Sequence, residues 1–153
     1  MAAQPWKVYN LAKKKIGNGT LNLASTAFRI TLHTSASNAA TLTLDTYQPA
    51  GTGPSAEVTE ANGYSSSGKA LTTEVWTVGA SAKQYKFDAD DVVWTGTGGA
   101  IANIKYAVIW LSAATTAGRH LLAFCSLTSS QFTLAQNNTL TLQMNSAGIL
   151  TLV

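Results

Sequence analysis

Charged side chains are scarce in this sequence. Of its 153 residues, 11% are Asp, Glu, Lys or Arg, against roughly 25% in an average soluble domain. Hydrophobic residues make up 46%, so the polar surface must come mainly from uncharged Thr, Ser, Asn and Gln. Because surface charge keeps protein molecules apart, so weakly charged a chain is expected to associate. We therefore expect an oligomer or a component of a larger assembly.

The sequence has a single cysteine, and it has neither a long apolar segment nor a recognisable secretion signal. Cys125 is the single cysteine, which excludes an intrachain disulfide and hence a disulfide-built scaffold. It lies in the apolar run HLLAFCSL, where a buried thiol is the expected outcome, although its reactivity is left open. No run approaches the roughly 18 apolar residues of a membrane span, and MAAQPWKVYN has no signal-peptide core. We expect a protein without membrane contact that is made in the cytoplasm.

Positive charge is concentrated at one end of the chain. The first 16 residues contain four lysines and no acidic residue, and the remainder has six basic and seven acidic residues. Nucleic-acid-binding proteins usually spread Lys and Arg along a face, with aromatic residues between them. One local cluster is more typical of a helix face, so direct nucleic-acid binding is not expected.

Only the N-terminal segment has a helical pattern. Pro5 suits the first turn of a helix, and apolar residues recur at helical spacing from Trp6 to Ile16. GNGT (17–20) then ends the pattern. We expect a helix at about 5–16, with Trp6 docking it on the rest of the domain.

The remainder of the chain alternates between strand and turn patterns. YQPAGTGPSAE (47–57) and ANGYSSSGKA (61–70) are expected to be loops because Pro, Gly and Ser are frequent in them. The expected strands are 27–34, 40–47, 70–78, 84–94, 100–112, 119–127, 138–145 and 148–153. Eight to nine short strands predict one all-β domain over 1–153, a β-sandwich or jelly-roll-like barrel whose β-rich body spans about 20–153.

The expected strands differ in their burial patterns. AFRITLHT (27–34) alternates apolar and polar residues and is expected to be half-buried. AIANIKYAVIWLS (100–112) has the most continuous apolar run and is expected to be a central strand buried on both faces. Segments 70–78 and 84–94 are expected to pair through the turn GASA.

Three aspartates in QYKFDADDVVWTGTGGA (84–100) form the first candidate site. On a strand, Asp88 and Asp90 share a face and Asp91 points to the other. Two carboxylates on one face could bind a hard cation, although the spacing of a calcium loop is absent. The favoured interpretation is a strand that ends in a turn whose carboxylates bind backbone amides. Whether Asp88 and Asp90 bind a cation is left open.

Other candidate groups are few. GTGGA (96–100) lacks the spacing of a phosphate loop and is interpreted as a hairpin connection. His33 and His120 are the only histidines, and nothing in the spacing around them supports a metal site. An odd separation points His120 and Cys125 to opposite faces of a strand, which excludes a local Cys–His pair. No catalytic, cofactor-binding or metal-ligating residue is assigned, and no enzymatic activity is expected.

The tryptophans suggest a further hypothesis, which is that the protein binds sugars. Exposed rings of Trp76, Trp94 or Trp110 could stack on sugar faces, as in a carbohydrate- or receptor-binding module. All three lie within strand patterns beside Val and Ile, so burial in the sheets is favoured. The binding module remains an alternative that requires at least one of them to be exposed.

Four longer segments together carry a family resemblance. They are KVYNLAKKKIGNGTLNLASTAFRITLHTS, EVTEANGYSSSGKALTTEVWTV, YKFDADDVVWTGTGGAIANIKYAVIW and LTLQMNSAGILTLV, and they cover nearly the whole chain. In this order they resemble a family of small virion structural proteins of tailed bacteriophages. The chain departs from that family's pattern at EANGY (60–64), at Lys105 in place of Arg, and at QMN (143–145) in place of Trp-Asp. The departures concern surface contacts rather than the fold.

The resemblance implies a virion structural protein with no catalytic residues to carry over. Within that class, we expect a capsid decoration (cement) protein on the outside of the head, bound to the major capsid protein as a homotrimer. It would be assembled in the host cytoplasm. A tail or baseplate component is the alternative. The N-terminal helix and the loops 47–70 and 112–119 are the expected contact regions.

Overall fold

The structure, a computed structural model, describes residues 4–24, 27–48 and 53–153. These residues form twelve strands, the helix α1 (Asn10–Gly17) and the short 3₁₀ helix η1 (Thr116–Gly118). The strands are β1 (Lys7–Val8), β2 (Phe28–His33), β3 (Lys69–Ala70), β4 (Val75–Val78), β5 (Tyr85–Asp88), β6 (Val92–Thr95), β7 (Ile101–Ile104), β8 (Tyr106–Leu111), β9 (Leu121–Ser126), β10 (Phe132–Leu134), β11 (Thr139–Leu142) and β12 (Leu150–Leu152). The predicted all-β fold with one short α-helix is confirmed, although the strands are shorter and more numerous than the eight to nine expected.

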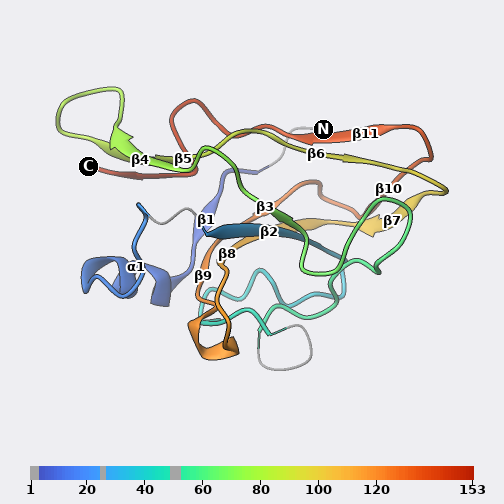
Figure 1. Ribbon diagram of the computed structural model, residues 1–153, viewed down its shortest axis with the longest axis horizontal. Coiled ribbons are helices and arrows are strands. Elements are labelled where there is room, and N and C mark those ends of the chain that lie inside the picture. Colours follow the sequence, from blue (N-terminus) through green and yellow to red (C-terminus); the bar gives the residue numbers. More distant parts are fainter. Residues whose placement is uncertain (1–3, 25–26, 49–52) are drawn as a thin grey trace.

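The largest sheet has the order β1-β9-β8-β2-β3 (Figure 1). The central strand predicted at 100–112 is confirmed only in its second half, because β8 is central and buried while β7 is a separate strand that pairs with β10. The β2 strand is also buried except at the half-buried Arg29, which corrects the expectation of a half-buried strand: Thr31 and His33 are both 0% exposed. The reason is that β3 covers only part of β2, and the segment 53–68 covers the rest through the bonds Val58 N–H to Leu32 O (2.9 Å) and Thr34 N–H to Ala56 O (3.0 Å).

The segments from β5 to β8 and from β9 to β12 form one long antiparallel ribbon. The pairs are nested, β8 with β9, β7 with β10, β6 with β11 and β5 with β12. Figure 1 shows the ribbon folded over at the β6–β7 and β10–β11 connections, so that β4, β5, β6, β11 and β12 lie above the large sheet. The result is the sandwich-like arrangement that the sequence predicts.

The glycine-rich link GTGGA (96–100) is not a hairpin, which corrects the prediction. Its two flanking strands pair with β11 and β10 instead of with each other. Gly96 donates to Asn138 O (3.0 Å) and accepts from Asn137 N–H (2.8 Å), so the ribbon stays hydrogen-bonded where it bends. A Cβ on Gly96 would lie 2.7 Å from the Ala135 carbonyl oxygen, and glycine therefore permits this close approach.

The core lies between the two layers. The Phe87 ring of β5 meets the Phe28 ring of β2, with centroids 5.0 Å apart. On the other side of the large sheet, Tyr47 stacks on Trp110 at 4.1 Å and 6°. The buried hydrophobic side chains form one cluster.

The N-terminal helix begins at Asn10, later than predicted. Lys7 and Val8 instead pair with Phe124 and Ala123 of β9, because the exposed edge of that strand offers a ladder of hydrogen bonds. Tyr9, rather than the predicted Trp6, is the fully buried aromatic at the start of the helix. Its hydroxyl donates to Ala39 O at 2.6 Å. No helix in the described ranges is long and apolar enough to cross a membrane.

The strand predicted at 40–47 does not form. Turn bonds run from Thr41 N–H to Asn38 O (2.8 Å) and from Leu44 N–H to Thr41 O (3.2 Å). Thr46 makes only an isolated bridge to His120. Leu42 O meanwhile accepts from the first amide of α1, Asn10 N–H, at 3.0 Å. The alternating Leu and Thr pattern is real, but only residues 45–47 pair with another segment, through Leu121 N–H to Asp45 O (2.9 Å) and Tyr47 N–H to Arg119 O (2.7 Å).

Candidate functional site

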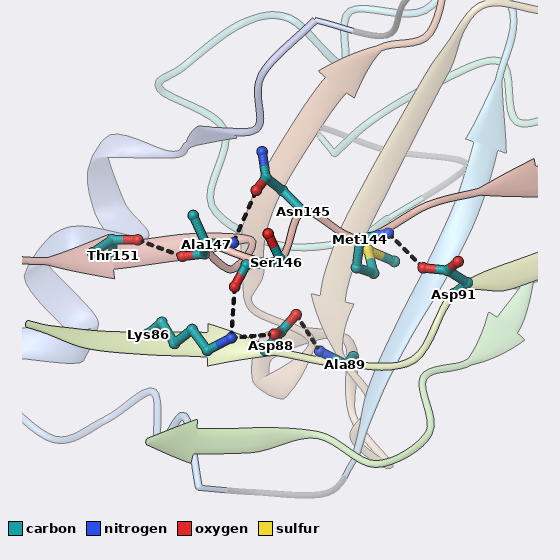
Figure 2. Close-up of polar contacts among 9 residues, drawn as sticks. All are labelled: Lys86, Asp88, Ala89, Asp91, Met144, Asn145, Ser146, Ala147 and Thr151. Atoms are coloured by element: carbon teal, nitrogen blue, oxygen red, sulfur yellow. Dashed lines mark hydrogen bonds and ion pairs between the residues drawn. The ribbon is translucent and has the colours of Figure 1, made fainter. Parts of the chain in front are cut away.

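The aspartates of the first candidate site bind separate partners (Figure 2). The Oδ2 atom of Asp88 accepts from Lys86 Nζ at 2.7 Å, and its Oδ1 accepts from Ala89 N–H at 3.0 Å. Asp91 Oδ1 accepts from Met144 N–H at 2.8 Å. Asp88 thus binds the amide next to it, as the turn interpretation predicts, whereas Asp91 binds an amide 53 residues further along the chain, which that interpretation does not predict.

Asp90 points to a third set of partners. Its Oδ2 accepts from the hydroxyls of Thr72 (3.2 Å) and Thr73 (2.6 Å). The parity argument fails because β5 ends at Asp88, so Asp90 and Asp91 are not strand residues. Within the described part of the chain, no three His, Cys, Asp or Glu side chains are grouped to hold a metal ion.

Lys86 connects the aspartate turn to the C-terminal part of the ribbon. Besides binding Asp88, its ammonium group donates to Ser146 O at 2.7 Å. The turn it reaches is closed by Ala147 N–H on Asn145 Oδ1 (2.9 Å) and by the Thr151 hydroxyl on Ala147 O (2.9 Å). These contacts hold β5 and β12 together where the ribbon is interrupted, which is a structural role.

His33 is buried and neutral, and both of its ring nitrogens have hydrogen-bond partners. Its Nδ1 lies 2.9 Å from Ser55 O and its Nε2 lies 3.0 Å from Thr31 Oγ1. Because a carbonyl oxygen only accepts, Nδ1 carries the proton and Nε2 accepts from the threonine hydroxyl. Burial lowers the pKa of His33 to about 4, partly opposed by the bond to Ser55.

His120 has a different environment. Its Nδ1 lies 2.8 Å from Lys15 Nζ, and Lys15 also forms an ion pair with Asp45. Burial and the lysine lower the pKa of His120. His33 and His120 share no partner, so the structure does not bring them together as a site.

Cys125 is buried within β9. Burial raises the pKa of its thiol to about 12, so the reactive thiolate is not populated near neutral pH. His120 lies just before β9 and is held by Lys15. The two side chains therefore form no Cys–His pair.

A polar cluster around Glu57 was missed in the sequence. Its carboxylate accepts from the Tyr47 hydroxyl, from the Tyr64 hydroxyl (2.7 Å) and from Ser67 N–H (2.8 Å). The Tyr64 oxygen also accepts from Leu32 N–H at 3.0 Å. Burial, together with the nearby Glu57 carboxylate, raises the pKa of both tyrosines, so they remain donors. The cluster fastens the segment 53–68 to β2, and its only sequence signal was one carboxylate and two tyrosines in segments interpreted as loop.

Lowering the pH is expected to weaken the fold through His33. The folded pKa of about 4 lies below the ordinary 6.5, so this group's contribution is complete above pH 6.5 and is lost as the pH falls toward 4. The loss amounts to about 3 kcal/mol. Denaturant unfolding between pH 7.5 and 4 measures it, and His33→Gln is expected to flatten the slope while His120→Gln leaves most of it. An unchanged slope in the His33 variant would contradict this assignment.

Two of the three tryptophans considered for sugar binding are buried. Trp94 and Trp110 are 0% and 2% exposed, which confirms the favoured interpretation for these residues. Trp76 is only half-buried, and it stacks on Tyr85 at a centroid distance of 6.0 Å. Of the sugar-stacking candidates, only Trp76 therefore has an accessible ring.

Exposed apolar side chains gather on the sheet with the order β12-β5-β4. Val78, Tyr85 and Leu152 are 49%, 48% and 46% exposed, and the strand register places them in one row. The next row contains Phe87, which is fully buried. Because both rows lie on one face, this face extends beyond the core. We call the exposed row the overhang, and Figure 1 shows this end of the sheet above α1.

Comparison of the chain with protein-family models, with curated proteins and with solved structures gave no match.

Proposed function

We propose that this protein is a structural component of a bacteriophage virion, a capsid decoration protein that binds the exterior of the head. The proposal is supported by the family resemblance of four segments spanning nearly the whole chain. The structural observation that carries it is the overhang, an uncharged apolar row at the end of a sandwich-like fold. Exposed apolar surface of this kind is typical of a protein that functions in contact with others.

The polar groups fit the same proposal. The aspartate turn, His33 and the Glu57 cluster all bind other parts of the chain and hold strands or segments in place. Together with the overhang, these structural roles support a function in surface contact. Each Å² of apolar area buried against the capsid would contribute about 25 cal/mol, and many copies on one head would together resist its expansion.

All three predicted contact regions present exposed surface, the third of them only in part. The α1 helix exposes Lys13 and Lys14, and the segment 112–119 is largely exposed around η1. Most of the third region, 47–70, lies within the described residues, and 53–68 covers β2, with Val58 and Tyr64 buried. Residues 49–52 of that loop lie outside the described residues.

Binding to particles tests the proposal. Heads and tails are prepared from a phage that encodes this protein but has been mutated so that it is not made. The purified protein is then mixed with the heads and, separately, with the tails. We expect the protein to sediment with the heads, and we expect decorated heads to release their DNA at a higher temperature than bare heads. Recovery with tails alone would instead support a tail or baseplate component. Sedimentation with neither would contradict a virion role.

The half-exposed Trp76 beside Tyr85 favours one second candidate, a carbohydrate- or receptor-binding module on the virion. Two stacked aromatic rings at the surface can bind a sugar face. Binding to a glycan panel that is lost in Trp76→Ala would support it, with Trp94→Phe as the buried control. An absence of glycan binding at high ligand concentration would exclude it.

A further inference from the structure

We propose that copies of this chain associate head to tail, with the overhang and α1 of one copy docking on the aspartate turn of the next. This inference rests on the self-association that the scarcity of charged residues predicts and not on the virion role. In it the overhang contacts a second copy of the chain, which leaves other exposed surface, such as the segment 112–119, for the capsid. The docking surfaces are named the basic end and the acidic corner. The basic end consists of Lys13, Lys14, Val78, Tyr85 and Leu152. The acidic corner consists of Val75, Asp90, Asp91 and Val93.

The basic end combines unpaired positive charge with exposed apolar surface. Lys13 and Lys14 are exposed on α1, and in the described part of the chain neither forms an ion pair, whereas Lys15 does. Ile16 and Trp76 line one surface hollow, which places the end of α1 beside β4. The lysine-bearing helix and the overhang therefore lie at the same end of the molecule (Figure 1).

The acidic corner combines negative charge with exposed apolar surface. Asp90 and Asp91 are exposed, and in the described ranges their bonds come from neutral donors, the threonine hydroxyls and an amide. Val75 and Val93 beside them are 40% and 42% exposed. The acidic corner therefore matches the basic end in apolar character and opposes it in charge.

Nearby basic groups reduce the charge of the acidic corner without cancelling it. Lys86 is neutralised by Asp88. Lys69 donates to Val93 O at 2.7 Å and contributes one positive charge. Against it stand the carboxylates of Asp90 and Asp91 and, close by, that of Glu74, which accepts from Phe28 N–H at 3.2 Å. The net charge at the acidic corner is therefore negative.

The positions of these side chains favour a head-to-tail contact over a two-fold one. Val75 and Val78 are three residues apart on one strand and point to opposite faces of the sheet. In a two-fold contact through the basic end, Lys13 and Lys14 would meet the same lysines of the second copy, which repels. Docking the basic end on the acidic corner pairs opposite charges and covers both apolar surfaces. Such a heterologous contact closes as a ring when the rotation permits, and a trimer is one such ring.

Charge reversal with rescue tests the inference. Sedimentation velocity of the unmodified full-length protein is expected to show an oligomer that weakens with added salt, because salt screens exposed charge pairs. The double variants K13E/K14E and D90K/D91K are each expected to be monomeric. An equimolar mixture of the two is expected to associate again, since each supplies the surface that complements the other. The quadruple variant K13E/K14E/D90K/D91K is expected to recover the original oligomer.

The controls separate lost contacts from lost folding. Glu60→Lys reverses another exposed acidic residue and is expected to leave the oligomer unchanged. Because Asp90 and Asp91 bind Thr73 and Met144, their replacement can loosen the turn, so the exposed pair Val78→Ser/Tyr85→Ser provides a second route to the monomer. Rescue in the mixture cannot arise from unfolded protein.

Three outcomes would overturn the inference. They are a monomer at every concentration, an oligomer that survives K13E/K14E, and failure of the folded mixture to associate. A monomeric protein that still sediments with heads would overturn head-to-tail association and leave the virion proposal standing.

Discussion

Replacing Glu57 with alanine is expected to lower the free energy of unfolding by about 3 to 5 kcal/mol. The carboxylate accepts from two tyrosine hydroxyls and from Ser67 N–H. Tyr47 and Tyr64 are almost completely buried, so their hydroxyls would lose an acceptor that water cannot fully replace. The substitution would also release the segment 53–68, which covers β2.

Denaturant unfolding of Glu57→Ala, Glu57→Gln and Glu60→Ala measures this effect. Glu60 lies three positions further along the chain and is exposed, so its replacement is expected to change stability by about 0.5 kcal/mol or less. Glu57→Gln keeps one acceptor oxygen and is expected to fall between the two. If Glu57→Ala were no more destabilising than Glu60→Ala, the cluster would not be what holds the segment 53–68 in place.

Replacing Trp94 with alanine is expected to cost about 3 to 5 kcal/mol, because a fully buried large side chain leaves a cavity that neighbours fill only in part. The ring is 0% exposed and lies on the inner face of β6. The neighbouring Val93, at 42% exposed, faces solvent. Val93→Ala is therefore the matched control, and we expect it to change stability by about 0.5 kcal/mol or less.

The indole nitrogen of Trp94 allows a finer test. In the described part of the chain its N–H has no hydrogen-bond partner, and a buried donor without an acceptor is unfavourable by about 1 to 3 kcal/mol. Trp94→Phe removes this donor while keeping most of the ring. We expect it to cost less than half as much as Trp94→Ala. Equal losses for Phe and Ala would show that the whole indole shape, rather than apolar volume, is required there.

The agreement between sequence and structure is closest where the pattern is local. Strands were expected at 27–34 and 119–127, and β2 and β9 form within these bounds. The pairing of 70–78 with 84–94 is present as β4 and β5. The local pattern could not show that most of 40–47 lacks a paired strand, because a Leu-Thr alternation is the same whether or not another strand lies beside it.

In the candidate site, too, the local contacts could be predicted from the sequence and the long-range contacts could not. The bond from Ala89 N–H to Asp88 was interpretable from the sequence, because the preference of Asp for bonds to nearby amides is local. The bonds of Asp90 and Asp91 to Thr73 and Met144 were not, because they join distant segments. Glu57, Tyr47 and Tyr64 gave no comparable signal. Their contact depends on how the segment 53–68 folds back over β2, which is a matter of distant packing.

By itself, the sequence determined the all-β class and the single short α-helix near the N-terminus. Each of these follows from residue type and spacing over a few positions. Only the tertiary structure decided that GTGGA is the bend of a folded ribbon and that the face containing Phe87 continues into an exposed overhang. Both depend on where one layer ends relative to the other, and that is set by long-range pairing, which no local pattern contains.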